Sequence, residues 1–83
     1  MKLTVRYFAS IREAVGKGEE LIETEAQSVD ALRSELIARG DAYANSLGQG
    51  KAVRVALDKV MASDSAPLHA GCEVAFFPPV TGG

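Results

Sequence analysis

The sequence predicts an α+β fold in one small domain over residues 1–83. A chain of this length suits a single hydrophobic core. Apolar side chains alternate with polar ones near both ends of the chain, which is typical of half-buried strands, whereas the middle repeats apolar residues at helical spacing. The expected order is strand, strand, helix, strand, strand, with one main helix covering one face of a small mixed sheet.

The first third of the chain is expected to hold two strands. Residues 3–8 alternate apolar and aromatic side chains with polar ones and predict the first strand. One or two helical turns follow at 9–15 and stop at Gly16. Residues 19–25 predict a second strand, and their poor alternation and many acids favour an edge position. We expect the acids to form a solvated rim: Glu19, Glu20, Glu23 and Glu25.

The main helix is expected at residues 29–39. Ser28 is a suitable N-cap, and Gly40 is a C-terminal signal. One apolar stripe predicts the side of this helix that packs on the sheet: Val29, Leu32, Leu36 and Ile37. A further short helix is expected at 41–47 and ends in the glycine-rich segment 48–50.

The second half of the chain is expected to hold the other strands. Residues 53–57 predict a third strand, which a turn at 58–59 joins to a short strand at 60–61. After a loop at 63–71, residues 73–77 predict the last strand. The sheet face away from the helix is expected to be only partly polar and to hold six residues: Arg6, Phe8, Ala56, Met61, Ala75 and Phe77.

Composition argues against several classes of function. The net charge of −2 does not suit nucleic-acid binding, which favours a basic face. No apolar run approaches the roughly 20 residues of a membrane span, and the alternating start does not resemble a signal peptide. One cysteine allows no internal disulfide, so we expect a reducing, cytoplasmic location.

The sequence shows no self-contained active site. His69 falls in a predicted loop without a matched nucleophile, and we expect an ordinary surface residue. Cys72 stands at the entry to a strand, where a lone cysteine is usually a small buried hydrophobe. No cysteine or histidine pair has the spacing of a metal site, and the glycines form no phosphate-binding loop.

The C-terminal segment carries the strongest functional signal. Pro78 and Pro79 directly follow the last strand, where they stop the sheet ladder and favour an extended exit. Gly82 and Gly83 lack a Cβ atom, so this end can pass through a narrow channel. We therefore expect an extended tail over about 78–83, whose terminal carboxylate a partner enzyme can activate.

Four segments of the chain carry a family resemblance: FASIRE at 8–13, the helix at 29–36, Pro67-Leu68, and GCEVAFFPPVTGG at 71–83. They resemble the small subunit of molybdopterin synthase, the MoaD family, and the last segment is the most specific. The similarity covers essentially the whole chain. One departure is Cys72, where the family usually has Asp, and residues 41–51 match poorly.

The resemblance implies a ubiquitin-like β-grasp fold and the role of a sulfur carrier. An E1-like (MoeB-like) adenylyltransferase would use ATP and magnesium to form an acyl-adenylate on Gly83, and a sulfur donor protein would convert it to a thiocarboxylate. The loaded tail would then enter the MoaE-like large subunit and donate sulfur to a cyclic pterin phosphate in molybdenum cofactor biosynthesis. The chain itself is expected to bind no cofactor or metal and to be non-catalytic alone.

Two groups of residues are expected to meet these partners. The tail would thread their channels with Pro78, Pro79, Val80, Thr81 and Gly82. Aromatic and methionine side chains on an otherwise polar surface suit the core of an interface, so we expect three residues to dock the partner: Phe8, Met61 and Phe77.

Three other functions are compatible with parts of this pattern. A sulfur carrier for thiamine biosynthesis is also a β-grasp chain that ends in Gly-Gly, but the Phe-Pro-Pro-Val segment and the longer chain favour the molybdopterin pathway. A ubiquitin-like protein modifier would form isopeptide-linked adducts. A stand-alone enzyme would need a catalytic constellation that the sequence does not show.

Overall fold

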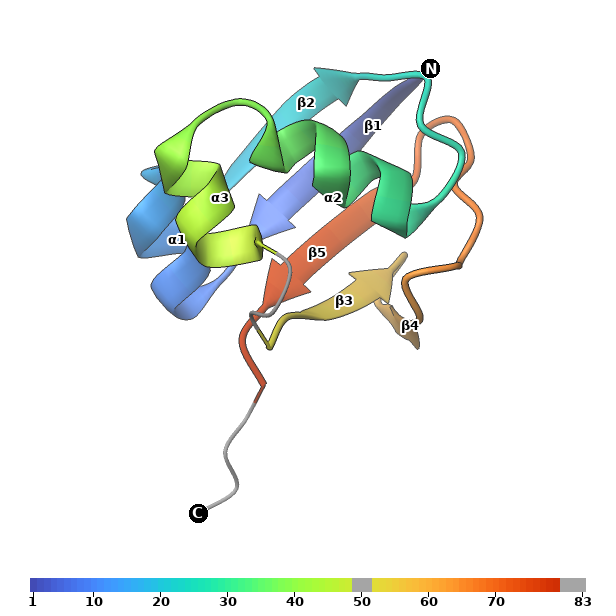
Figure 1. Cartoon of the computed structure of the whole chain (residues 1–83). Helices are drawn as coiled ribbons and strands as arrows, with labels where there is room; N and C mark the ends of the chain where they lie inside the picture. Colours follow the sequence, from blue (N-terminus) through green and yellow to red (C-terminus); the bar gives the residue numbers. More distant parts are fainter. Residues whose placement is uncertain (49–51, 80–83) are drawn as a thin grey trace.

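The computed structural model describes residues 1–48 and 52–79. Figure 1 shows one sheet with the helices gathered over one of its faces. The elements in chain order are β1 (Lys2–Tyr7), α1 (Ala9–Val15), β2 (Glu19–Glu23), α2 (Val29–Ile37), α3 (Asp41–Leu47), β3 (Arg54–Leu57), β4 (Val60–Ala62) and β5 (Glu73–Phe77). The predicted α+β class is confirmed. The predicted order of strand, strand, helix, strand, strand holds for β1, β2, α2, β3 and β5, and the short elements expected at 9–15, 41–47 and 60–61 are present as α1, α3 and β4. None of the helices in the described ranges is long and apolar enough to cross a membrane.

The five strands form one mixed sheet in the order β2-β1-β5-β3-β4. β1 and β5 are parallel neighbours, and the other pairs are antiparallel. β2 lies at an edge, as its acids predicted. Because β5 lies between β1 and β3, the chain leaves the sheet from the middle, beyond Phe77.

The core lies between the sheet and the helices. Tyr7 and Phe76 are its largest fully buried side chains, and their ring centroids are 6.5 Å apart. Full burial of an apolar side chain contributes about 1.5–3 kcal/mol. The stripe predicted for the main helix packs here, although Ile37 is only partly buried. Its other three members are fully buried: Val29, Leu32 and Leu36.

α2 ends at Ile37, two residues earlier than the sequence predicts. Ala38 caps this helix, and Gly40 becomes the N-cap of α3. The φ of Gly40 is 151°, which a residue with a Cβ rarely adopts, so the glycine separates two helices instead of only ending one. At the start of α2 the predicted N-cap is confirmed, because Ser28 Oγ accepts a hydrogen bond from Ala31 N–H at 3.2 Å.

β2 ends at Glu23, two residues earlier than predicted. Thr24 turns the chain, since its Oγ1 accepts a hydrogen bond from Ala26 N–H at 3.0 Å. The same hydroxyl donates to Glu35 Oε2 at 2.6 Å and thereby joins the end of β2 to α2. Elsewhere β3 begins, and β4 ends, one residue later than predicted, while β1 begins and ends one residue earlier.

Glu20 does not belong to the solvated rim predicted for β2. It lies opposite Val5, which is buried, and its side chain is only 15% exposed. Tyr7 Oη and Arg39 each donate a hydrogen bond to its carboxylate at 2.8 Å, and Tyr43 Oη donates a third at 3.2 Å. A carboxylate can face inward here because three donors compensate its burial. The other acids of the rim are exposed: Glu19, Glu23 and Glu25.

Candidate functional site

The sheet face away from the helices carries a row of side chains that crosses four strands. Arg6 on β1 pairs with Ala75 on β5. Ala75 pairs with Ala56 on β3, which pairs with Met61 on β4, so the four residues share one face. The alternation continues at the ends of β1 and β5, which adds the last members of the predicted face: Phe8 and Phe77.

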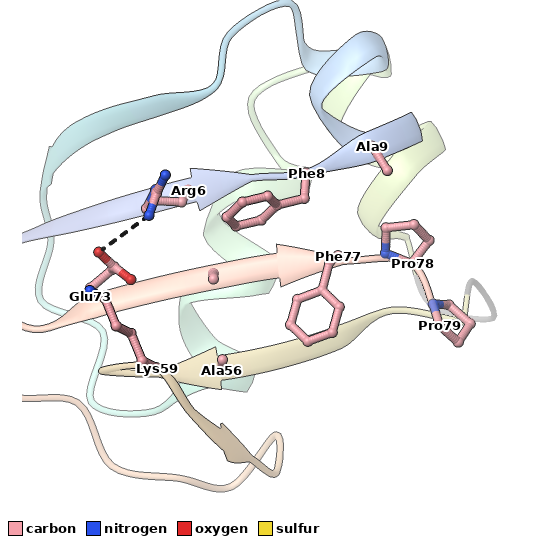
Figure 2. A pocket seen from close by; sticks show the side chains of 10 residues that line it. Arg6, Phe8, Ala9, Ala56, Lys59, Glu73, Phe77, Pro78 and Pro79 are labelled. Carbon is pink, nitrogen blue, oxygen red and sulfur yellow. Dashed lines mark ion pairs between the residues drawn. The ribbon is translucent and has the colours of Figure 1, made fainter. Parts of the chain in front are cut away.

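A groove of about 620 Å³, which we call the open-face groove, lies over this row. Figure 2 shows the rings of Phe8 and Phe77 standing on the same side of the strands, with Ala56 below them on β3. The groove exists because Ala56 and Ala75 are small, whereas the residues around them are larger. Its lining is mainly apolar: Arg6, Phe8, Ala9, Ala56, Lys59, Glu73, Ala75, Phe77, Pro78 and Pro79. Such a hollow suits apolar side chains of a protein partner.

Charged groups beside the groove compensate one another. The guanidinium carbon of Arg6 lies 5.1 Å from the ring centroid of Phe8, in the range of a cation–π contact. Arg6 Nη1 lies 3.9 Å from Glu73 Oε1, an ion pair that Figure 2 marks, and Arg6 Nε lies 3.7 Å from Glu19 Oε1. These contacts restrain Arg6 and Phe8 before any partner binds.

Phe8 and Phe77 come together in the groove, but Met61 does not line it. Met61 lies on the same face at the edge strand, where it is 54% exposed. Sequence reasoning missed three residues that line the groove: Ala9, Lys59 and Glu73. Leu21 on β2 shares this sheet face and is 75% exposed, but it lies outside the groove. The poor alternation along β2 does not assign Leu21 to a face, which only the pairing with β1 decides.

The exit of the C-terminal segment adjoins the groove. Phe8 N–H donates to Phe76 O at 3.1 Å, so the chain after β1 still runs beside the end of β5. Pro78 and Pro79 follow β5 directly, and both line the groove. The rest of the predicted tail lies outside the described residues: Val80, Thr81, Gly82 and Gly83. A partner that occupies the groove is therefore already beside the start of the tail.

Asp58 and His69 form side-chain contacts that join the β3–β4 turn to the segment before and at the start of β5. His69 is exposed, as predicted, and its Nε2 lies 2.8 Å from Asp58 Oδ2, a hydrogen bond that raises the pKa of His69. Asp58 Oδ1 accepts from Glu73 N–H at 2.9 Å, which ties the β3–β4 turn to the start of β5. Cys72 is fully buried, as predicted. Across residues 1–48 and 52–79, no group of three His, Cys, Asp or Glu side chains could hold a metal ion.

The strand order, the helices over one face and the two parallel central strands define a ubiquitin-like β-grasp protein, as the resemblance implied. Residues 5–83 match the ThiS family, and the chain belongs to that family. It is 41% identical over 81 residues to the molybdopterin synthase sulfur carrier subunit of Escherichia coli strain K12, a match that covers 98% of this chain and 99% of the relative.

Two solved structures are also similar. A Pyrococcus furiosus protein, solved as a candidate subunit 1 of molybdopterin converting factor, is 30% identical with a TM-score of 0.79. That match covers 96% of this chain and 99% of the other. A chain from the complex of subunits 1 and 2 of molybdopterin-converting factor from Helicobacter pylori is 25% identical with a TM-score of 0.69, over the full length of both chains.

Proposed function

We propose that this chain is the sulfur carrier subunit of a molybdopterin synthase. The observation that carries the proposal is the 41% identity to the Escherichia coli sulfur carrier subunit over nearly the full length of both chains. The similarity at 30% identity to the Pyrococcus furiosus protein agrees with it. Because activation consumes ATP, we place the process in the cytoplasm.

The proposed chemistry takes place at the carboxylate of Gly83. A carboxylate has no good leaving group, so an E1-like enzyme with ATP and magnesium first converts it to an acyl-adenylate and releases pyrophosphate. The terminal sulfur of a persulfide on a donor protein then displaces AMP to form an acyl disulfide. A thiol cleaves its S–S bond, which releases the thiocarboxylate and leaves a disulfide on the donor. This sulfur passes to a cyclic pterin phosphate in the large subunit. We assign the acids, bases and phosphate-binding groups of these steps to the partner proteins.

We propose that the large subunit docks over the open-face groove. Phe8 and Phe77 present aromatic surface there, and the Arg6 contacts restrain Phe8 before binding, which lowers the entropy lost on association. The Helicobacter pylori relative comes from a complex of subunits 1 and 2 of molybdopterin-converting factor, which supports a partner of this kind. Met61 lies on the same face and extends the proposed docking surface to the sheet edge.

We propose that the segment from Pro78 to Gly82 threads into the active site of each partner. Its start beside the groove supports this role, because docking then directs the tail into the protein that covers the groove. Four residues follow Pro79, so Gly83 can lie at most about 14 Å beyond it at full extension. That reach matches a reacting group delivered into a buried pocket.

Mass spectrometry of protein isolated from cells that make molybdopterin tests the proposal directly. A fraction of the chain should carry the mass change of one oxygen replaced by sulfur, and fragmentation should place it on Gly83. The matched control is the chain without Gly83, which should never become loaded. The proposal fails if no loaded protein forms when the E1-like enzyme, ATP and a sulfur donor are all present. Loading without transfer in the presence of the large subunit would instead favour the carrier of thiamine biosynthesis.

A further inference from the structure

β4 is a short strand at the end of the sheet, and no strand in residues 1–48 and 52–79 pairs with its outer side (Figure 1). It closes one edge of the sheet and contains Val60, Met61 and Ala62. Val60 is 67% exposed and Met61 is 54% exposed. An uncharged edge strand of this kind offers its backbone groups to a further strand.

The hydrogen bonds of the neighbouring strands show which backbone groups of β4 point outward. Asp58 N–H donates to Glu73 O at 2.8 Å, so the backbone of Asp58 faces β5. Along a strand, the backbone N–H and C=O groups of successive residues point to opposite neighbouring strands. Leu57, the residue before Asp58, therefore points its N–H and C=O toward β4, where they bond with the backbone of its partner Val60. One residue further along β4, the backbone N–H and C=O of Met61 must point away from β3.

The opposite edge of the sheet is protected. Tyr7 N–H donates to Gly18 O, so the backbone of Gly18 faces β1. By the same alternation the backbone of Glu20 also faces β1, and the backbone N–H and C=O of Leu21 point outward. Leu21 lies between Glu19 and Glu23, whose side chains are each 66% exposed. Two carboxylates beside the free backbone groups repel an approaching strand, whereas β4 has no charge within its three residues.

We infer that an extended segment of the large subunit pairs with the free edge of β4 through the backbone N–H and C=O of Met61. The inference rests on the proposed function, because the large subunit is the protein proposed to cover the open-face groove. Met61 belongs to the row of side chains that crosses this face, so the pairing site adjoins the docking surface, one strand spacing of about 4.8 Å from β4.

The geometry also restricts the chemistry of that segment. It is short, since β4 has only three residues, and it has an N–H where it meets Met61, which excludes proline at that position. Its side chains on the groove side are apolar, to match the exposed Met61, and those on the opposite face are apolar beside the exposed Val60. Lys59, which precedes β4, favours a carboxylate at the end of the segment nearest the turn.

Amide hydrogen exchange of the wild-type chain, alone and with an excess of the large subunit, tests this inference. We expect the Met61 amide to exchange freely in the isolated chain and at least tenfold more slowly in the complex. If the complex forms and the Met61 amide still exchanges at its free rate, the strand pairing is wrong while the proposed function stands. If no complex forms, both are overturned.

Two proline variants separate backbone pairing from simple coverage. Met61→Pro removes the outward N–H, which an edge strand tolerates, whereas Met61→Ala removes only the side chain. We expect Met61→Pro to weaken binding at least tenfold more than Met61→Ala, and Leu21→Pro, at the opposite edge, to leave affinity unchanged. Equal losses of affinity for the large subunit in Met61→Pro and Met61→Ala would overturn the inference. If Met61→Pro does not fold, the wild-type exchange experiment decides alone.

A second copy of the chain is the competing occupant of this edge. Sedimentation of the isolated protein should show a monomer with a freely exchanging Met61 amide. A dimer that protects this amide without the large subunit would overturn the choice of partner.

Discussion

Phe77 combines three features that a single residue rarely has on a small domain. It ends the central strand, it lines the open-face groove, and it directly precedes Pro78 and the proposed tail. Its ring is only partly exposed, so it is held in place before a partner arrives. These features are typical of a hot spot at the centre of an interface.

Phe77→Ala should therefore weaken binding of the large subunit by about 2 kcal/mol or more, roughly thirtyfold in Kd. Calorimetric titration of the two subunits measures this loss directly. Leu21→Ala is the matched control, because Leu21 lies on the same sheet face, is more exposed and does not line the groove. An unchanged affinity for a folded Phe77→Ala protein would show that the groove is not the docking site.

Cys72, unlike Phe77, is a residue of the core and has no surface to offer a partner. Its side chain is fully buried at the entry to β5, and its backbone carbonyl accepts a hydrogen bond from Thr4 N–H at 3.0 Å. A buried thiol has no path to a sulfur donor in the folded chain. Its place in the core agrees with a sulfur transfer that involves only the C-terminal residue.

At the scale of elements, one carboxylate joins a strand to two helices. Glu20 on β2 accepts hydrogen bonds from Tyr7 on β1, from Arg39 after α2 and from Tyr43 on α3. Burial alone would raise the pKa of Glu20, but the hydrogen bonds from Arg39 and Tyr7, with the charge of Arg39, outweigh it and keep this pKa below its usual value. Burial and the bond to Glu20 raise the pKa of Tyr7, so its hydroxyl remains a donor.

The sign of this shift gives a pH dependence of stability. Because the pKa of Glu20 is lower in the folded state, its contribution is present above about pH 4.5 and is lost as the pH falls through the folded value. Glu20→Gln should lower the free energy of unfolding by about 1.5–3 kcal/mol at pH 7, the magnitude for hydrogen bonds to a charged group. The difference in the free energy of unfolding between this variant and wild type should be smaller at pH 3.

Urea unfolding at the two pH values measures this effect. Glu25→Gln is the control, since Glu25 is exposed and lies just beyond β2. A Glu20→Gln variant as stable as wild type at pH 7 would show that the cluster is dispensable.

At the scale of the whole molecule, the sheet order brings the proposed docking surface and the start of the proposed tail together. β5 is flanked by β1 and β3, so the groove over these strands and the exit at Pro78 lie together. In the proposed mechanism, docking fixes the starting point of the tail, and the number of residues after it fixes where the reacting group arrives. One residue changes the reach by up to about 3.3–3.6 Å, which equals the whole separation of atoms poised to react.

A chain with one glycine added after Gly83 should thus lose at least about a hundredfold in sulfur transfer, while its affinity for the large subunit stays within a few-fold of wild type. Single-turnover transfer from chemically loaded protein gives the rate. Thr81→Ser keeps the length and should transfer at a nearly normal rate. Normal transfer by the extended chain would contradict the proposed positioning.

Much of the fold could be predicted because its signals are local. Alternation placed the strands other than β2, the stripe from Val29 to Leu36 placed the buried side of α2, and Ser28 marked the start of that helix. The six residues of the open sheet face were predicted from period two alone. The errors at the ends of α2 and β2 arose where Gly40 and Thr24 make turns that depend on the next element.

The sequence by itself determined the elements, their buried faces and the Pro-Pro-Val-Thr-Gly-Gly end, because side-chain periodicity and backbone preferences act over a few residues. Only the tertiary structure decided that β5 lies between β1 and β3, that Glu20 faces three donors, and that the backbone of Met61 opens to the free edge. These features depend on which strands pair and on which helices return over them. Pairing brings together residues distant in the chain, and no local pattern records that choice.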